Sequence, residues 1–260
     1  MDKMIVVLGP TTSGKTSLAV QLADTINGEI ISADSRQIYK GMDIGTGKDL
    51  DEYHYNKHII TNYLIDIIDP SEDYSVYQFR KDYLHALSSI KTNNSTPILC
   101  GGTGLYIESI LLDYQMPKTP PNKKLRNKLE GYSLDELCEL LIKQDKSQYD
   151  KKYHISKRRI IRTLEIVEES KISSIQMNKT GSNILDSTLI IGIKTERAIL
   201  LERIKKRLHK RLNNGMIEEV KLLLEQGISF ERLQYFGLEY KYIGEYLSKK
   251  TDYNSMVERL

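Results

Sequence analysis

Short apolar runs alternate with helical patterns along the first 113 residues. Thr16–Ile26 and Val76–Ile90 carry apolar residues at the spacing of one helix face. The apolar runs between them have the length of buried parallel strands, and we predict strands at Met4–Leu8, Glu29–Ala33, Tyr63–Ile68 and Pro97–Cys100. This alternation predicts an α/β fold in which helices flank a parallel sheet.

A different pattern begins after Asp113. Prolines at positions 117, 120 and 121 interrupt the alternation, and a lysine-rich region without strand patterns follows them. We interpret this region as a helical insertion at residues 117–181. It would separate a first part of the core, residues 1–116, from a second part, residues 182–260.

The alternating pattern resumes after the insertion. Leu185–Ile193 is an apolar run typical of a strand, and Glu196–Gln226 shows a long helical period. The last segment, Asp252–Leu260, begins like a capped helix but stops after about two turns, too short for a helix to persist unsupported. We therefore expect the chain to be cut short at this point.

Composition and charge set the broad class of protein. The 260 residues are 28% charged and 40% hydrophobic, as in an ordinary globular protein. Cys100 and Cys138 are too few for a disulfide framework or a four-thiolate zinc site. No apolar stretch approaches the roughly 20 residues that span a bilayer, so we expect a cytoplasmic protein without membrane contact. The net charge is only +3, so an acidic partner would need a local basic patch.

The clearest chemical motif occupies residues 9–16. The motif G-x-x-x-x-G-K-[S/T] lies between a predicted strand and a predicted helix, and its residues are Gly9, Pro10, Thr11, Thr12, Ser13, Gly14, Lys15 and Thr16. Loops of this kind hold a di- or triphosphate with backbone N–H groups and the lysine, and the final hydroxyl can bind Mg²⁺. A chance glycine turn before a helix is the alternative interpretation. The motif does not indicate which molecule carries the phosphates.

Two polar segments follow predicted strands at the sheet edge where ligands bind. Asp34 comes after the second strand and could act as a metal-linked carboxylate, a general base or a turn cap. Thr103 offers a hydroxyl within Gly101-Gly102-Thr103-Gly104, although glycines after a strand commonly form only a tight turn. The residues alone leave these roles open.

Two clusters of basic residues could supply the local patch. Arg203, Arg207 and Arg211 recur every four residues, so they share one face of a helix. The segment Lys151–Arg162 contains no acid, and its cations and Tyr153 suit the phosphates and bases of a nucleic acid. A solvated basic face is the alternative for both clusters.

Taken together, these motifs resemble those of the bacterial tRNA dimethylallyltransferases. The similar segments keep the family's order and approximate spacing over nearly the whole chain, at 9–16, 33–39, 42–46, 101–106 and 158–165. The resemblance implies a P-loop NTPase-like fold with a mainly helical, tRNA-binding insertion. It also implies transfer of a dimethylallyl group from dimethylallyl diphosphate to N6 of the adenosine just 3′ of the tRNA anticodon. The expected cofactor is Mg²⁺, and a monomer that binds the anticodon stem-loop is expected.

The resemblance further assigns roles to individual residues. It implies Asp34 as the general base, with Thr103 and Arg207 as the other catalytic residues. Residues 9–16 would hold the diphosphate, and Mg²⁺ would lie near Thr16. The residues implied for tRNA binding are Asp34, Ser35, Arg36, Gln37, Arg158, Arg159, Arg162 and Gly237.

Other functions remain open on the sequence alone. A P-loop kinase for a small metabolite would use Asp34 to orient a hydroxyl towards ATP. An enzyme that prenylates free AMP, ADP or ATP would need no tRNA-sized basic surface. A non-enzymatic RNA-binding protein is a third alternative, although intact Lys15, Thr16 and Asp34 count against it. The sequence also departs from the family pattern, because residues 45–49 read Gly-Thr-Gly-Lys-Asp where Gly-Thr-Ala-Lys-Pro is usual, which predicts a looser loop.

Overall fold

The computed structural model of this chain describes residues 3–114, 116, 119–172 and 184–260. Contacts divide the chain into two compact units. Unit 1 comprises Met1–Asp113 and Gly181–Leu260, and unit 2 comprises Tyr114–Thr180. The predicted insertion at 117–181 begins and ends on residues outside the described ones, so its limits remain a prediction.

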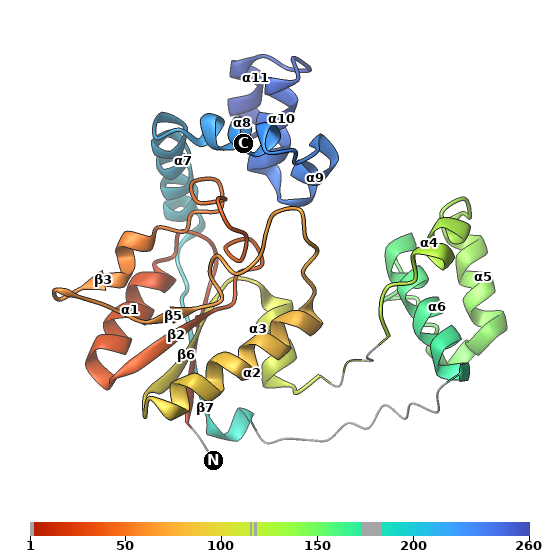
Figure 1. Cartoon of the computed structure of the whole chain (residues 1–260), viewed down its shortest axis with the longest axis horizontal. Helices are drawn as coiled ribbons and strands as arrows, with labels where there is room; N and C mark the ends of the chain where they lie inside the picture. The colour runs from red at the N-terminus through yellow and green to blue at the C-terminus, as the bar shows by residue number, and fades with distance from the viewer. Residues whose placement is uncertain (1–2, 115, 117–118, 173–183) are drawn as a thin grey trace. The chain divides into compact units, whose positions relative to one another are not determined.

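A five-stranded parallel sheet forms the centre of unit 1 (Figure 1). Its order is β5-β2-β6-β1-β7, and every neighbouring pair is parallel. The strands are β1 (Met4–Leu8), β2 (Gly28–Ser32), β5 (Asn62–Tyr63), β6 (Thr96–Gly101) and β7 (Thr188–Gly192). The sheet confirms the predicted α/β class. Because all strands run the same way, their carboxyl ends, and the loops that follow them, meet at one edge.

Both faces of this sheet are covered, which explains why its strands are apolar without alternation. Successive residues of a strand point to opposite faces. Val7, Ile30 and Ile98 join one apolar cluster with helix α1 (Lys15–Ile26). Their neighbours Val6, Ile31 and Leu99 join the other cluster, which includes helices α2 (Val76–Thr92) and α3 (Gly104–Leu111). The helices predicted at Thr16–Ile26 and Val76–Ile90 are therefore confirmed.

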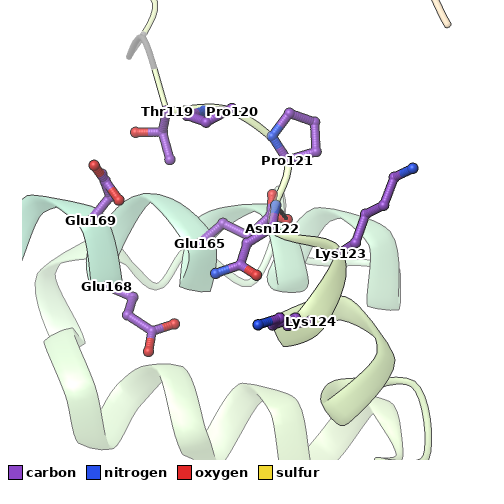
Figure 2. A pocket seen from close by; sticks show the side chains of 9 residues that line it. All are labelled: Thr119, Pro120, Pro121, Asn122, Lys123, Lys124, Glu165, Glu168 and Glu169. Carbon is purple, nitrogen blue, oxygen red and sulfur yellow. Dashed lines mark hydrogen bonds between the residues drawn. The ribbon is translucent and has the colours of Figure 1, made fainter.

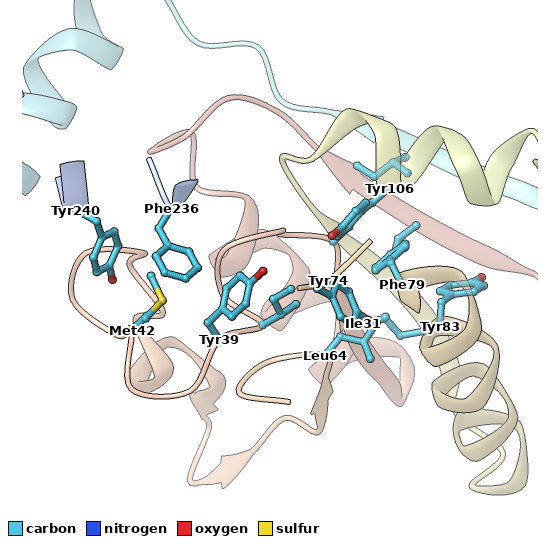
Figure 3. Packing of buried hydrophobic residues seen from close by; sticks show 14 of the residues in the cluster. Ile31, Tyr39, Met42, Leu64, Tyr74, Phe79, Tyr83, Tyr106, Phe236 and Tyr240 are labelled. Atoms are coloured by element: carbon cyan, nitrogen blue, oxygen red, sulfur yellow. The ribbon is translucent and has the colours of Figure 1, made fainter. Parts of the chain in front are cut away.

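Five helices follow the last strand: α7 (Arg197–Asn213), α8 (Met216–Glu225), α9 (Phe230–Tyr235), α10 (Leu238–Leu247) and α11 (Tyr253–Arg259). They join the core of unit 1 through aromatic residues. The Phe236 ring lies 4.8 Å from the Tyr39 ring and 5.9 Å from the Tyr240 ring, and Met42 lies beside them (Figure 3). Among the described residues, none of the helices is both long enough and apolar enough to cross a membrane.

Three sequence predictions need correction. The helical period at Glu196–Gln226 forms two helices, because Gly215 takes a left-handed conformation with φ of 97° between α7 and α8. The strand predicted at Tyr63–Ile68 stops at Tyr63, because Leu64 and Asp66 both have positive φ. The strand predicted at Leu185–Ile193 begins with a 3₁₀ turn at Leu185–Ser187 and pairs only over Thr188–Gly192.

A short hairpin and a 3₁₀ turn complete the described part of unit 1. The antiparallel pair consists of β3 (His54–Tyr55) and β4 (His58–Ile59). It follows a 3₁₀ turn at Leu50–Tyr53. Tyr53 and Ile60, which flank this hairpin in the chain, join the apolar cluster that includes α1 and so attach the hairpin to that helix.

All regular elements among the described residues of unit 2 are helical. It contains α4 (Lys123–Leu129), α5 (Leu134–Asp145), a 3₁₀ turn at Lys146–Gln148, and α6 (Lys157–Ile172). Ser133 caps α5 in a capping box with Glu136, a pattern that marks a helix start. The three helices enclose an apolar core of their own, formed by Leu129, Leu137, Leu141, Ile160, Leu164 and Val167. The predicted helical character of the insertion is thus confirmed.

Candidate active site

The phosphate-loop motif forms a turn between β1 and α1. Gly14 has a φ of 87°, and Thr12 has a positive φ of 59°, which is uncommon for a β-branched residue. The side-chain oxygens Thr12 Oγ1 and Ser13 Oγ are buried and have no hydrogen-bond partner among the described residues. Lys15 Nζ donates to Pro10 O at 2.6 Å within the same loop. Buried donors without partners are costly, so this loop is suited to receive an anion.

The ends of β2 and β6 approach each other closely beside this loop. A Cβ added to Gly101 would overlap the backbone of Ala33, so only glycine fits there. Thr103 N–H donates to Ala33 O at 3.1 Å, and Thr103 Oγ1 accepts from Ser35 N–H at 3.0 Å. The Thr103 side chain therefore holds the segment that carries Asp34.

Asp34 has one carboxylate oxygen engaged and one available. Its Oδ1 accepts from Arg36 N–H at 2.9 Å, which is the turn-capping role that the sequence left open. Its Oδ2 has no hydrogen bond within the described residues. Burial lowers the pKa of the Lys15 ammonium, Cys100 and Asp34 oppose that decrease, and Arg207 adds to it. Asp34 and Arg207 therefore both act electrostatically on the lysine of the phosphate loop.

The arginine face of α7 contacts two loops, and on it Arg207 and Arg211 are half-buried while Arg203 is exposed. Arg203 Nη1 donates to Thr12 O of the phosphate loop at 3.4 Å. Arg207 Nη2 donates to Gly47 O at 3.2 Å and to Asp49 Oδ2 at 2.7 Å. Arg211 Nη1 donates to Gly45 O at 3.4 Å, and burial followed by Arg207 lowers the pKa of Arg211. The face thus sets Arg203 against the phosphate-loop motif, and Arg207 and Arg211 against the loop at residues 45–49.

The Glu219 carboxylate binds the loop that Arg207 and Arg211 contact. Glu219, in α8, accepts the backbone N–H groups of Asp43, Ile44 and Gly45 at 2.8, 2.6 and 3.0 Å. It also accepts the Tyr240 hydroxyl at 2.8 Å. Because these contacts join positions that are more than 170 residues apart, they anchor the loop to the C-terminal helices.

A buried lysine fixes the same loop to the core of unit 1. The Lys48 side chain is only 1% exposed. Its Nζ donates to Tyr39 O at 2.6 Å and to Asp43 Oδ1 at 2.7 Å, and it also pairs with Asp66. The departure from the family pattern at 45–49 therefore does not produce an unsupported loop.

Residues next to Asp34 contact the loop at residues 43–49 and the C-terminal helices. Gln37 Nε2 donates to Gly47 O at 3.0 Å, which ties the predicted RNA-contacting segment to the loop under Arg207. The Arg36 guanidinium lies 4.9 Å from the centre of the Tyr235 ring. Gly237, which follows shortly after, has a φ of 122° and begins α10. The structure thus brings Arg36 and the surroundings of Gly237 together.

An apolar pocket of about 540 Å³ adjoins the phosphate loop. Gly9 and Pro10 form one side of it, and the glycines of the 101–104 segment form another. The remaining lining consists of Leu8, Ile107, Glu108, Leu111, Leu112 and Leu185. A pocket with an apolar wall beside an anion-binding loop suits a ligand with a hydrocarbon end and a phosphate end.

In unit 2 the predicted RNA-binding arginines have different surroundings. Arg158 is exposed and has no hydrogen bond, ion pair or ring contact within the described residues. The Arg159 guanidinium lies 5.0 Å from the centre of the Tyr153 ring. Arg162 Nη1 instead contacts Glu165 Oε2 at 3.0 Å, and its Nη2 donates to Thr119 O at 2.7 Å. Arg162 therefore helps to hold unit 2 together.

Glu165 is the centre of that contact network. Its side chain has no exposed area, and it accepts from the Asn122 N–H at 2.8 Å and from Arg126 Nε at 2.7 Å. Burial disfavours its charge, but the hydrogen bonds from Arg126, Arg162 and Asn122 outweigh burial and lower the pKa of Glu165. Figure 2 shows Glu165 and Asn122 together in a pocket between α4 and α6.

Comparison with known families identifies the chain. The family model described as IPP transferase matches residues 37–260, and the model described as isopentenyl transferase matches residues 2–66. The chain belongs to the IPP transferase family. tRNA dimethylallyltransferase 1 of Syntrophus aciditrophicus is 41% identical over 260 residues, which cover 100% of this chain and 85% of that protein. tRNA dimethylallyltransferase 2 of Porphyromonas gingivalis is 48% identical over 253 residues, which cover 97% and 82%.

Solved structures agree with this family membership. The crystal structure of the full-length tRNA isopentenylpyrophosphate transferase of Bacillus halodurans has a TM-score of 0.68 at 31% identity, covering 100% of this chain and 82% of that one. A eukaryotic dimethylallyltransferase acting on tRNA has a TM-score of 0.78 at 26% identity, covering 100% and 66%. The predicted resemblance, the P-loop NTPase-like fold and the assignment to the transferases are therefore confirmed.

Within this IPP transferase, unit 1 gathers most of the predicted site. Asp34, Thr103, Arg207 and residues 9–16 lie at one edge of the sheet, while their catalytic and binding roles remain predictions. Sequence reasoning missed Glu219, Lys48 and Asp49, which hold the loop around Gly47. Only Asp49 gave a signal, because it stands where the family usually has proline.

Proposed function

We propose that this chain transfers a dimethylallyl group from dimethylallyl diphosphate to N6 of the adenosine just 3′ of the tRNA anticodon. The observation that carries the proposal is the convergence of the phosphate loop, Asp34 and Arg207 at one sheet edge, beside an apolar pocket. In the reaction, the bond between the allylic carbon and the diphosphate oxygen breaks and a bond from N6 to that carbon forms. The N6 proton passes to Asp34, and diphosphate leaves.

The phosphate loop and its neighbours would stabilise the departing diphosphate. Its backbone N–H groups, the partnerless hydroxyls of Thr12 and Ser13, and the Lys15 ammonium supply donors. Lys15 would exchange its contact with Pro10 O for a phosphate oxygen. Arg207 lies near enough to affect Lys15, so it would meet the same charge from the α7 side.

Mg²⁺ is expected beside Thr16. Among the described residues no group of three His, Cys, Asp or Glu side chains could hold a metal ion by itself. Mg²⁺ commonly combines few protein ligands with substrate phosphates and water, so the Thr16 hydroxyl and the diphosphate would suffice. Bound there, the ion would neutralise charge on the leaving group.

Asp34 would act as the general base through its available oxygen. The exocyclic amine of adenine is a weak nucleophile, and removal of its proton as the C–N bond forms assists attack. The contact from Arg36 N–H to Oδ1 fixes the carboxylate, which leaves Oδ2 to take the proton. Thr103 would keep this segment in place through Ser35.

The tRNA would contact both units. A base that is stacked in the anticodon loop must be extracted before it can react. Ser35, Arg36 and Gln37 follow the proposed base in the chain and would contact the extracted adenosine. Arg158 and Arg159, in unit 2, would meet phosphates of the anticodon stem-loop. We further propose that the chain acts as a monomer.

The decisive test uses radiolabelled dimethylallyl diphosphate and Mg²⁺ with purified protein. The acceptors are unmodified tRNA, the same tRNA with guanosine in place of the target adenosine, and AMP. We expect label only in the tRNA that carries the adenosine. Label in AMP would support the free-nucleotide alternative, and phosphoryl transfer from labelled ATP would support a kinase; either result would contradict the proposal. The apolar pocket beside the phosphate loop favours a prenyl donor over ATP.

A further inference from the structure

Arg207 is held from one side by the loop at residues 47–49. Its Nη2 donates both to Gly47 O at 3.2 Å and to Asp49 Oδ2 at 2.7 Å. A guanidinium has five N–H donors arranged in a planar fork. No hydrogen bond among the described residues involves Nη1 or Nε of Arg207. Its other edge can therefore bind a phosphate while Asp49 keeps its contact.

The loop provides a fitted surface for this arginine. Gly47 has a φ of 67°, and an added Cβ would overlap the terminal nitrogens of both Arg207 and Arg211. The two guanidinium groups therefore rest directly on the loop backbone. Lys48 is buried, and Glu219 binds the backbone of the loop at residues 43–45, so this surface is anchored from both sides.

The arginine face of α7 that carries Arg207 also contacts the phosphate loop. Arg203, one turn earlier on the same face, donates to Thr12 O of the phosphate loop. Burial lowers the pKa of Lys15 in that loop, and the nearby charge of Arg207 adds a smaller decrease. On this face the phosphate loop therefore contacts Arg203, and Asp49 contacts Arg207, one turn further along.

We propose that Asp49 is a positioning residue that holds the Arg207 guanidinium in the orientation needed to stabilise the leaving diphosphate. This inference rests on the proposed function. Asp49 would act through Arg207 and would not touch the reacting atoms. Fixing a catalytic group in place is worth up to about 10²-fold in rate, since misplacement by about 1 Å can cost that much.

Positioning has a kinetic signature that differs from a simple effect of charge. Asp49 carries a negative charge near the proposed diphosphate site, so its removal alone should strengthen binding of the anionic substrate. Loss of positioning should instead lower kcat, because the arginine would be poorly placed when charge develops on the leaving group. The pair is partly exposed, at 27% for Arg207 and 55% for Asp49, so folding should depend on it little.

The experiment compares Asp49→Asn with Asp51→Asn. Asp51 is exposed, lies two residues further along, and its side chain has no hydrogen bond or ion pair among the described residues. Its variant makes the same change in net charge. We would measure kcat and KM for dimethylallyl diphosphate with saturating tRNA, the Kd for inorganic diphosphate, and the Tm. We expect Asp49→Asn to lower kcat about tenfold without raising KM or Kd. Asp51→Asn should stay within about twofold of the unmodified chain, and Asp49→Glu should recover part of kcat.

Three results would overturn the proposal. The first is equal kcat for Asp49→Asn and Asp51→Asn, and the second is a raised KM with unchanged kcat. The third is a kcat for Asp49→Glu no higher than for Asp49→Asn, with both variants folded. If Asp49→Asn melts below the assay temperature, the Asp49→Glu measurement decides alone. A kcat of Asp49→Glu equal to that of the unmodified chain would then show that the exact placement of Arg207 does not matter. Absence of transfer by the unmodified chain would instead refute the proposed function.

Discussion

Arginines meet acidic side chains in both units, but the two arrangements differ in what remains available to a ligand. In unit 2, Arg126 and Arg162 converge on Glu165, whose side chain has no exposed area. In unit 1, Arg207 contacts Asp49, which is 55% exposed, and keeps one edge of its guanidinium without a partner among the described residues. The first arrangement stabilises a fold, whereas the second leaves one edge of a cation available to a ligand.

The difference lies in the burial of the acid and not in the arginines. A fully buried carboxylate must be satisfied by the fold, so its arginines are committed to it. An exposed carboxylate contributes little to stability through its ion pair, which agrees with the positioning role proposed for Asp49. Both arrangements involve basic clusters, on α6 and α7, that look alike in the sequence. Variants that separate a role in stability from a role in ligand binding therefore test this comparison.

The largest effect is expected for the proposed general base in unit 1. Asp34→Ala should lower turnover by about 10²- to 10⁴-fold while tRNA and diphosphate still bind, because proton transfer is lost. Asp34→Asn sharpens the test, since its Oδ1 can still accept from Arg36 N–H but cannot take a proton. Single-turnover transfer of labelled dimethylallyl to tRNA gives the rates. Full activity of the asparagine variant would show that Asp34 serves only as a turn cap.

Local patterns explain why this part of the site was predictable. The phosphate loop and the Asp34 and Thr103 segments each follow an apolar strand, and parallel strands bring their carboxyl ends to one edge. Strand, turn and glycine signals are contained within a few residues, so the sequence predicts them without knowledge of distant contacts.

Other parts of the structure depend on contacts between distant positions. Glu219 binds residues 43–45 across more than 170 residues, and no local pattern marks such a contact. The apolar residues after Tyr63 suggested a strand, but positive φ at Leu64 and Asp66 turns the chain away from the sheet. Likewise, the spacing of Arg159 and Arg162 could not show that Arg162 forms an ion pair with the buried Glu165.

In unit 2, replacement of the buried acid should have the next largest effect. Glu165→Gln should destabilise this unit by about 2–3 kcal/mol at pH 7, because Arg126 and Arg162 lose their charged partner. Both arginines are partly exposed, which limits the loss. Hydrogen exchange of the α6 amides in the whole chain would report the loss. Glu168→Gln, at an exposed position of the same helix, is the matched control.

This destabilisation should depend on pH in a defined direction. The pKa of Glu165 is lowered below 4.5 in the folded chain, so its ionised form favours folding. Its contribution is complete above pH 4.5, the value for the unfolded chain, and is lost as the pH falls through the lower folded value. The stability difference between the unmodified chain and Glu165→Gln should therefore shrink below pH 4.5. A difference that is constant from pH 7 to pH 3 would contradict the assignment.

A smaller effect is expected when the phosphate loop loses its lysine. Lys15→Ala should weaken binding of inorganic diphosphate by about 10- to 100-fold, since a hydrogen bond to a charged group contributes about 1.5–3 kcal/mol. Calorimetric titration measures the affinity. Lys206→Ala, which removes an exposed lysine from α7, controls for the change in net charge and should have little effect. Equal affinity of the two variants would contradict the phosphate-loop assignment.

The smallest effect separates two of the arginines of α6, Arg158 and Arg162. Arg158→Ala should weaken tRNA binding about three- to fivefold and reduce the salt dependence of binding by about one phosphate contact, without changing the Tm. Arg162→Ala should lower the stability of unit 2, because Glu165 and Thr119 O lose its guanidinium. Binding at several salt concentrations, combined with hydrogen exchange of α6, distinguishes the two. If Arg162→Ala reduced the salt dependence and left α6 protected, the arginine would be an RNA contact, and burial of the acid would not decide the role of its partners.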